Sequence, residues 1–414
     1  MTWLDLPPDS LFGISNLPYG VFSADDRRRP GSGMPRGPGV RRVPRGSRVG
    51  VRIGDSVLDL AQVLDDPVFG QPSLNAFMAQ GRTRWSDVRA RITELLTAER
   101  HRRVVEASLY PLSGVRLHLP FAPGDYVDFY GNEHHAGNVG RLFRPGSEPL
   151  PPNWKHLPIG YHGRAGTIVV SGTPVTRPRG QRKEPKDRVP TFGPSRRLDF
   201  EAEVGFVVGT GSLPGAPVGV GEFANRVFGV FLVNDWSSRD LQAWESTPLG
   251  PFLAKSFATS ISPWIVPLDA LEHARISPPP RAAELLPYLA DVDKWGLDLA
   301  LEVRLNGQVV SRPPFATMYW TPAQMLAHMT VNGASTRTGD LYASGTVSGP
   351  DRDQRGCLLE LSWGGAEPVT LADGSVRSFL LDADEVTFTA TAPGAGGVRV
   401  GFGEVTGQIL PAKS

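Results

Sequence analysis

The chain has 414 residues, and its 43 lysines and arginines nearly balance its 42 aspartates and glutamates, for a formal net charge of +1. This length suits two or three domains with a substantial core, and the balanced charge points to neither a nucleic-acid partner nor a membrane partner. The single cysteine, Cys357, excludes an intramolecular disulfide framework and a zinc site built from Cys-x-x-Cys pairs.

The first part of the chain reads as short strands and turns. Alternating apolar residues predict strands at 19–22, 48–53 and 57–60. Between them, residues 27–48 are basic and rich in proline and glycine. Because no aromatic side chain interleaves these arginines for base stacking, we expect a solvated loop there and no nucleic-acid patch.

Residues 73–108 carry apolar stripes at helical spacing, with Ser73 as a predicted N-cap and Gly81 separating two helices. A break at 110–114 places the predicted domain boundary near residue 117, giving domains 1–117 and 118–414. The second domain is predicted to be β-rich, with helices at 238–245 and 321–329 and strands at 167–171, 200–208, 227–234, 299–305, 357–363, 385–390 and 398–403.

The 47 glycines and 39 prolines put turns throughout, so the whole chain is expected to be mainly β with some helix. No apolar stretch approaches the length of a membrane span, and the first residues show no secretory signal. These features favour a cytoplasmic enzyme.

Acidic residues cluster in three short stretches. Asp128 lies in 126–130, Asp235 and Asp240 lie in 233–241, and 198–206 alternates acidic with apolar residues. That alternation predicts a strand with Asp199, Glu201 and Glu203 on one face, where like charges repel. A hard divalent cation such as Mg²⁺ or Ca²⁺ would relieve the repulsion. A solvated polar strand face would explain the stretch equally well.

Two further groups of residues could act in catalysis. His135 ends the segment 128–135 and titrates near neutral pH, so it could act as a base toward water, although adjacent loop histidines are more often surface residues. If 238–245 is helical, Arg239 and Gln242 share a face. With Lys255 they could stabilise an oxyanion or enolate, and the alternative is an ordinary amphipathic helix.

Familiar nucleotide and hydrolase motifs are missing from the sequence. The loop at 209–215 has the wrong glycine spacing for a dinucleotide site, and neither a G-x-S-x-G elbow nor a phosphate-binding P-loop is present. The glycine-rich segment 339–349 could wrap a ligand carboxylate with backbone N–H groups, or it could be a plain turn.

Several segments together resemble the fumarylacetoacetase group of the fumarylacetoacetate hydrolase family, nearly from end to end. They are Asn16–Ser23, Ser73–Met78, Pro152–Ala165, Asn234–Asp240, Pro248–Leu253, Lys255–Phe257 and Ser344–Thr346. The resemblance implies an N-terminal SH3-like barrel, a C-terminal mixed β-roll domain that carries the active site, and a homodimer.

The resemblance also implies roles for individual residues. Asp128, Glu201, Glu203 and Asp235 would hold a divalent cation, Mg²⁺ or Ca²⁺, with Thr259 supporting them. His135 would activate water with Glu360 orienting it, and Arg239, Gln242 and Lys255 would stabilise the oxyanion and the leaving enolate. The substrate would be held by Tyr130, Arg144, Tyr161, Gly345 and Thr346.

The implied reaction is metal-dependent hydrolysis of the carbon–carbon bond of fumarylacetoacetate, a small 1,3-diketo acid, to fumarate and acetoacetate. This is the last step of tyrosine and homogentisate breakdown. Ser246 departs from the pattern, because the family would have an active-site tyrosine there. The alternatives are an acylpyruvate hydrolase or related 1,3-dicarbonyl hydrolase or decarboxylase of the superfamily, and a non-catalytic binding protein on the same fold.

Overall fold

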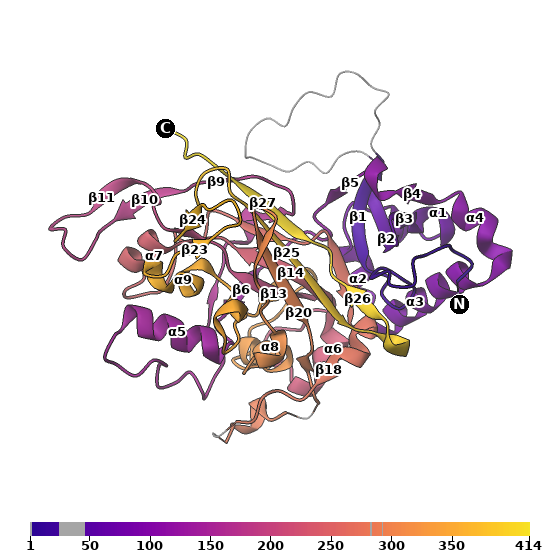
Figure 1. Cartoon of the computed structure of the whole chain (residues 1–414). Coiled ribbons are helices and arrows are strands. Elements are labelled where there is room, and N and C mark those ends of the chain that lie inside the picture. Colours follow the sequence, from indigo (N-terminus) through magenta and orange to yellow (C-terminus); the bar gives the residue numbers. More distant parts are fainter. Residues whose placement is uncertain (1, 25–45, 282–283, 292) are drawn as a thin grey trace.

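The computed structural model describes residues 2–24, 46–281, 284–291 and 293–414, and in these ranges the chain is mainly β with several helices (Figure 1). Residues 27–45 of the predicted basic loop lie outside the described residues. Within the described ranges, no helix is both long enough and apolar enough to cross a membrane.

The N-terminal elements lie together at one end of the molecule (Figure 1). The strands are β1 (Tyr19–Ala24), β2 (Arg48–Ile53), β3 (Ser56–Asp59), β4 (Leu109–Pro111) and β5 (Val115–His118). The helices are α1 (Leu60–Val63), α2 (Asn75–Met78), α3 (Arg82–Thr97) and α4 (Arg102–Glu106). The strands and helices predicted here are confirmed, and Gly81 separates α2 from α3 with a φ of +85°.

One large sheet crosses from this region into the rest of the chain. Strand β1 pairs with β2 and β5 and also with β17 (Trp264–Pro267), which belongs to the C-terminal part. The sheet continues through β14 (Val227–Asp235), β13 (Ala202–Val208), β22 (Leu341–Ala343), β6 (Tyr126–Phe129) and β7 (Gly160–His162). The domain boundary at residue 117 stays a prediction.

The middle of this sheet is buried on both faces. Every residue of β13 and β14 is buried, and the two strands pair antiparallel with Ala202 opposite Asn234. Strand β22 pairs with β13 on one side and runs parallel to β6 on the other, with Ala343 opposite Asp128. The pairing therefore brings acidic residues from distant parts of the sequence onto neighbouring strands.

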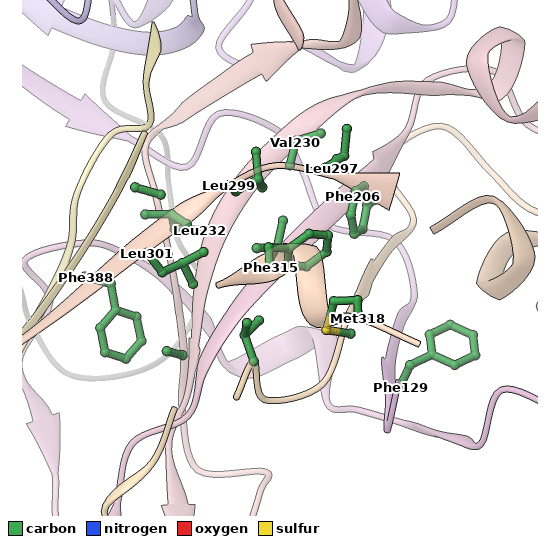
Figure 2. Packing of buried hydrophobic residues seen from close by; sticks show 14 of the residues in the cluster. Phe129, Phe206, Val230, Leu232, Leu297, Leu299, Leu301, Phe315, Met318 and Phe388 are labelled. Atoms are coloured by element: carbon green, nitrogen blue, oxygen red, sulfur yellow. The ribbon is translucent and has the colours of Figure 1, made fainter. Parts of the chain in front are cut away.

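A second sheet packs its apolar side chains against the first. It contains β21 (Gln308–Ser311), β20 (Ala300–Leu305), β25 (Glu385–Pro393), β27 (Val405–Leu410), β9 (Val175–Thr176) and β26 (Arg399–Gly401). Phe206 and Leu232 from the first sheet join Leu301 and Phe388 from the second in one buried cluster (Figure 2). Each such side chain contributes about 1.5–3 kcal/mol on burial, so the cluster holds the sheets in a fixed relation.

The remaining α-helices and strands of the described residues surround these two sheets, join the first sheet or form small two-stranded pairs. The helices are α5 (Glu133–Phe143), α6 (Phe223–Arg226), α7 (Arg239–Glu245), α8 (Pro322–Thr330) and α9 (Leu358–Leu361). The strands are β8 (Ile168–Val170), β10 (Arg179–Arg182), β11 (Thr191–Pro194), β12 (Leu198–Asp199), β15 (Ser237–Ser238), β16 (Thr259–Ile261), β18 (Arg275–Ile276), β19 (Gly296–Leu297), β23 (Val369–Thr370) and β24 (Val376–Arg377). The predicted helices at 238–245 and 321–329 are confirmed by α7 and α8.

Two predictions about which residues are helical are wrong. Residues 357–363 were predicted as a strand, but helix α9 begins at Leu358, since Leu-Leu-Glu-Leu favours a helix and the Asp199 carboxylate accepts its first N–H groups. His135 was expected in a loop, but it lies in α5, where the Asn132 side chain accepts the His135 N–H at 2.9 Å as an N-cap.

Candidate functional site

Four carboxylates converge in the interior of the C-terminal part. Asp128 extends from β6, Glu203 from β13 and Asp235 from the end of β14. Glu201 lies just before β13, where its backbone bridges to Cys357. All four carboxylates are buried, and one oxygen of each lies within 4.8 Å of the others.

On one side of this cluster, the carboxylate oxygens meet no hydrogen-bond donor from the described residues. Among the described residues, Asp128 Oδ1 and both oxygens of Glu203 have no hydrogen-bond partner. Burial, followed by the neighbouring carboxylates, raises the pKa of Asp128 and of Glu203 well above the usual range. Unpartnered, buried carboxylate oxygens are the donors that Mg²⁺ and Ca²⁺ bind, so this residue set fits a hard divalent cation.

Three neighbours hold Asp235 and Glu201 on the other side of the cluster. Lys255 Nζ donates to Glu201 Oε2 and, at 2.7 Å, to Asp235 Oδ2. The Thr259 hydroxyl donates to Asp235 Oδ1 at 3.1 Å, and the Tyr161 hydroxyl donates to Asp235 Oδ2 at 3.2 Å. Burial works to lower the pKa of Lys255, but Asp235 and Glu201 raise it above its usual value, so the ammonium stays charged.

Arg239 adds a second buried cation. Arg239 lies in the first turn of α7, and its Nη2 forms an ion pair with Glu201 Oε1 at 2.8 Å, although the angles do not make this a hydrogen bond. Its Nη1 donates a hydrogen bond to Gln242 Oε1 at 3.1 Å. Burial works to raise the pKa of Glu201, but Arg239 and Lys255 lower it. His135 contributes to the lowering, so its imidazole lies within electrostatic reach of Glu201.

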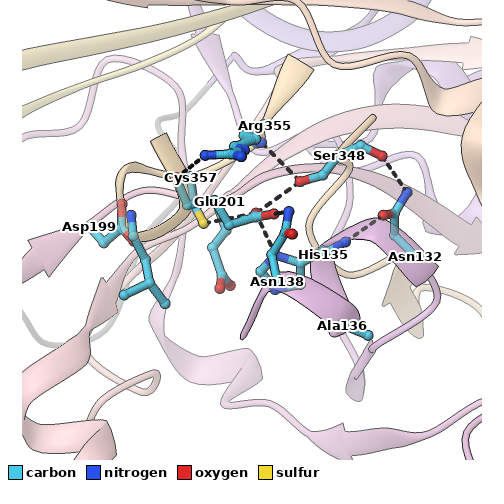
Figure 3. Close-up of polar contacts among 12 residues, drawn as sticks. Asn132, His135, Ala136, Asn138, Asp199, Glu201, Ser348, Arg355 and Cys357 are labelled. Atoms are coloured by element: carbon cyan, nitrogen blue, oxygen red, sulfur yellow. Dashed lines mark hydrogen bonds and ion pairs between the residues drawn. The ribbon is translucent and has the colours of Figure 1, made fainter. Parts of the chain in front are cut away.

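His135 and Glu360 form a buried pair. Figure 3 shows His135 together with Glu201 of the carboxylate cluster and with Asn138, Ser348 and Cys357. The His135 Nδ1 atom lies 2.6 Å from Glu360 Oε2. Burial works to raise the pKa of Glu360, but His135 and further hydrogen-bond donors lower it to about 2. The carboxylate therefore stays ionised at neutral pH and fixes the orientation of the imidazole.

Three further donors to Glu360 were missed by sequence reasoning. Asn138 Nδ2 donates to Oε1 at 2.8 Å, while Ser348 Oγ and Cys357 Sγ donate to Oε2 at 2.8 Å and 3.2 Å. Asn138 could have been found, because it lies three residues after His135 on the same helix face. Ser348 had no local signal, since only the tertiary fold brings it to the glutamate.

The structure brings most of the predicted substrate-contact residues close to these groups. The Tyr130 ring meets the His135 ring edge-on, with centroids 5.4 Å apart. Gly345 has a φ of +77°, and a Cβ there would lie 2.1 Å from the Phe129 carbonyl oxygen. The buried Thr346 hydroxyl has no hydrogen-bond partner among the described residues, which leaves it free for a ligand.

Arg144 lies farther out, at the end of α5. Its side chain is exposed, and Nη2 donates to the Pro149 carbonyl at 2.8 Å. Burial and then Glu360 raise the pKa of Tyr130, and the Arg144 charge opposes them, so the guanidinium lies within electrostatic reach of that phenol.

Two of the acidic residues do not join the cluster. Asp199 was expected to share a face with Glu201 and Glu203, but the strand is interrupted after β12 and the Asp199 carboxylate turns to Arg239 and to the start of α9. Asp240 instead accepts hydrogen bonds from the Ser195 hydroxyl and from backbone N–H groups, so its role is structural.

Ser246 follows the last residue of α7. Its hydroxyl donates to the Gln242 carbonyl at 2.6 Å, which is a local bond within the helix end. The side chain is half-buried and shorter than the phenol expected from the family pattern.

Comparisons with known proteins agree with this architecture. Residues 15–120 match the family described as Fumarylacetoacetase N-terminal, and residues 126–406 match Fumarylacetoacetate (FAA) hydrolase C-terminal. Fumarylacetoacetase from Homo sapiens is 42% identical, covering 100% of this chain and 99% of that protein, and the Caenorhabditis elegans protein is 45% identical, covering 99% of each.

Among solved structures, the fumarylacetoacetate hydrolase of Exiguobacterium antarcticum superposes with a TM-score of 0.55 at 17% identity, covering 96% of this chain and 100% of that one. At this identity the likeness shows the fold alone. It agrees with the predicted mainly β chain, with an N-terminal domain and a C-terminal domain of this fold. Full-length identity above 40% and two family matches lead to one conclusion: the chain belongs to the fumarylacetoacetate hydrolase family.

Proposed function

We propose that this protein hydrolyses the carbon–carbon bond of fumarylacetoacetate, giving fumarate and acetoacetate. One observation carries the proposal: four buried carboxylates, two of them with unpartnered oxygens, converge in a cluster whose Glu201 lies within electrostatic reach of a histidine held by a buried glutamate. Such a site combines cation binding with a base for water. The fumarylacetoacetase relatives, which match the full chain, support the choice of substrate.

Asp128, Glu201, Glu203 and Asp235 would hold the divalent cation, Mg²⁺ or Ca²⁺, with Thr259 orienting Asp235. When bound, a cation of this kind acts as a Lewis acid that polarises the paired oxygens of a 1,3-diketone. Without it, the repulsion among the carboxylates would oppose binding of an anionic substrate.

His135 is the proposed base. Its Nδ1 carries the proton shared with Glu360, which leaves the other ring nitrogen to take a proton from water. The hydroxide adds to the carbonyl carbon that becomes the fumarate carboxylate. Glu360 stabilises the imidazolium formed in this step, because an ionised carboxylate lies against the charged ring.

The carbon–carbon bond then breaks, and its electron pair leaves with acetoacetate as an enolate. Arg239, Gln242 and Lys255 are proposed to stabilise this negative charge, since two are buried cations and the third is held beside Arg239. The proton held by the His135 imidazolium passes to the enolate carbon, so the base is restored and atoms and charge balance.

Substrate carboxylate and carbonyl groups would be held by Tyr130, Tyr161, Thr346, the Gly345 backbone and, nearer the surface, Arg144. The unpartnered Thr346 hydroxyl and the exposed Arg144 guanidinium support this assignment. The acylpyruvate hydrolase and the non-catalytic alternatives are not favoured, because the relatives that span the chain are fumarylacetoacetases.

We also propose a homodimer in the cytoplasm, on the family resemblance. Light scattering of the purified protein tests the first point, and localisation of a tagged chain tests the second. A monomer at working concentration, or a tagged chain outside the cytoplasm, contradicts the respective proposal.

The test of the function uses purified protein, fumarylacetoacetate, and Mg²⁺ or Ca²⁺, with loss of the diketone absorbance as the readout. The expected result is turnover that needs both the metal and His135, with fumarate recovered in equal amount to the substrate lost. His135→Ala and a chelator are the negative controls. Wild-type protein with metal bound and no turnover overturns the substrate assignment.

A further inference from the structure

Asp199 is a fully buried carboxylate that the proposed mechanism does not use. Its oxygens accept four hydrogen bonds. Oδ1 accepts the backbone N–H groups of Leu358 at 2.7 Å and Phe200 at 2.9 Å, and Oδ2 accepts Arg239 Nε at 2.8 Å and the Leu359 N–H at 3.0 Å. All four partners are donors, and an ionised carboxylate is the side chain that accepts from every side.

Two of these bonds fix the start of α9. Leu358 and Leu359 are its first residues, and their N–H groups have no partner within a helix this short. Glu360 is the next residue, and its carboxylate holds His135. The position of the base therefore depends on where the first turn of α9 is anchored.

A third bond fixes Arg239. Its Nε donates to Asp199, while its Nη1 and Nη2 atoms reach Gln242 and Glu201. The guanidinium is planar, so a bond at Nε sets the direction in which the other two nitrogens point. Asp199 thereby orients a second group of the site, besides the turn that carries Glu360.

We propose that Asp199 is a positioning residue. Its one carboxylate fixes both Arg239 and the first turn of α9, which carries Glu360. The base and the groups that stabilise the enolate are thereby held where they can act on the same substrate molecule. This inference rests on the proposed function. Within the described residues, Asp128 Oδ1 and both Glu203 oxygens have no hydrogen-bond partner, so Asp199 does not bind them, and it reaches the carboxylate cluster through Arg239 and Glu201.

The test is a double-mutant cycle on the metal-loaded enzyme. Asp199→Asn keeps the size of the side chain but directs an amide donor against the N–H and guanidinium donors. We expect kcat to fall about 10- to 100-fold, with KM changed less than about twofold and metal affinity retained. Introduced into Arg239→Lys or into Glu360→Gln, the same change should lower kcat by a smaller factor than in the wild-type enzyme, because one of the two groups that Asp199 positions is already impaired.

A matched control is Asp384→Asn. Asp384 is also a buried carboxylate, bound to Arg377, Asn306 and the Leu381 N–H, none of which belongs to the site. We expect it to lower the melting temperature without lowering kcat. The proposal is overturned if Asp199→Asn lowers kcat by the same factor in Arg239→Lys and in Glu360→Gln as it does in the wild-type enzyme. It is also overturned if Asp384→Asn lowers kcat as much as Asp199→Asn does. If Asp199→Asn does not fold, Asp199→Ser carries the cycle, since its hydroxyl still accepts.

A second readout does not need turnover. In ¹⁵N-histidine-labelled protein, the Nδ1–H resonance of His135 is identified by its loss in His135→Gln. We expect Asp199→Asn to shift this resonance and Asp384→Asn to leave it in place, and an unshifted resonance in Asp199→Asn overturns the proposal. If the wild-type enzyme does not turn over fumarylacetoacetate, the proposed function fails, and this resonance still decides the positioning role.

Discussion

His135 Nδ1 lies 2.6 Å from Glu360 Oε2, and the two residues are 225 positions apart in the chain. Both side chains are buried, so water does not screen the contact. The glutamate is itself held by Asn138, Ser348 and Cys357. The pair is therefore a preorganised acceptor for the proton that hydrolysis must move.

Glu360→Gln should lower kcat about 100-fold and leave KM nearly unchanged, because a neutral amide cannot stabilise the imidazolium. Steady-state kinetics with fumarylacetoacetate measures the change. Glu302→Gln is the control, since this β20 glutamate pairs, among the described residues, with the solvent-accessible arginines Arg304 and Arg312 and should keep wild-type activity. Equal rates for the wild-type enzyme and Glu360→Gln would remove Glu360 from the mechanism.

The pH dependence of stability follows from the same carboxylate. Its pKa is lowered from 4.5 to about 2, so its ionised form stabilises the fold above pH 4.5. That contribution, on the order of 3 kcal/mol, is lost as the pH falls toward 2. The melting temperatures of the wild-type protein and of Glu360→Gln, measured from pH 6 to pH 2, should therefore converge at low pH. Parallel curves would contradict this sign.

Removal of divalent cations should lower both activity and melting temperature. Burial and neighbouring carboxylates raise the pKa of Asp128 and of Glu203, so ionising both is costly without a cation. A cation that binds only the folded state stabilises it, by about 2.7 kcal/mol at 100 times the dissociation constant. Calorimetric scans with a chelator, Mg²⁺ or Ca²⁺ measure the effect. Glu203→Gln should abolish most of the cation-dependent shift, whereas Asp384→Asn should retain it.

Gly345→Ala should destabilise the fold by more than about 1 kcal/mol and reduce activity, because the φ of +77° disfavours alanine and its Cβ would strike the Phe129 carbonyl. Gly396→Ala separates the two causes, since Gly396 has a φ of +70° with no atom within 4 Å of the added Cβ. Denaturant unfolding of both variants gives the comparison. If Gly345→Ala lowers the free energy of unfolding no more than Gly396→Ala does, the close approach of the added Cβ to the Phe129 carbonyl has no cost.

Ser246→Tyr should lower KM for fumarylacetoacetate about tenfold, if the added phenol donates a hydrogen bond to a substrate carboxylate. The native Ser246 hydroxyl is engaged with the Gln242 carbonyl. Ser246→Phe is the matched variant, with the same ring and no hydroxyl. A KM that falls equally in both variants would assign the gain to ring packing.

Much of the fold and site could be predicted from sequence because the signals are local. Short apolar stretches marked β14 and β20, and apolar residues at helical spacing marked α3. The acidic residues and His135 stood out within short motifs. The resemblance to the family rested on contiguous segments, and the comparisons bear it out.

What the tertiary structure decided depends on contacts between distant segments. The stretch around Glu360 is helical because Asp199, about 160 residues earlier, accepts its first N–H groups. His135 reaches Glu360 from 225 positions away, which only the folded chain allows. Periodicity reports which face of an element is buried, but it carries no information about which partner a buried polar group will meet. That partner is chosen by sheet pairing and core packing, which join residues far apart in the sequence.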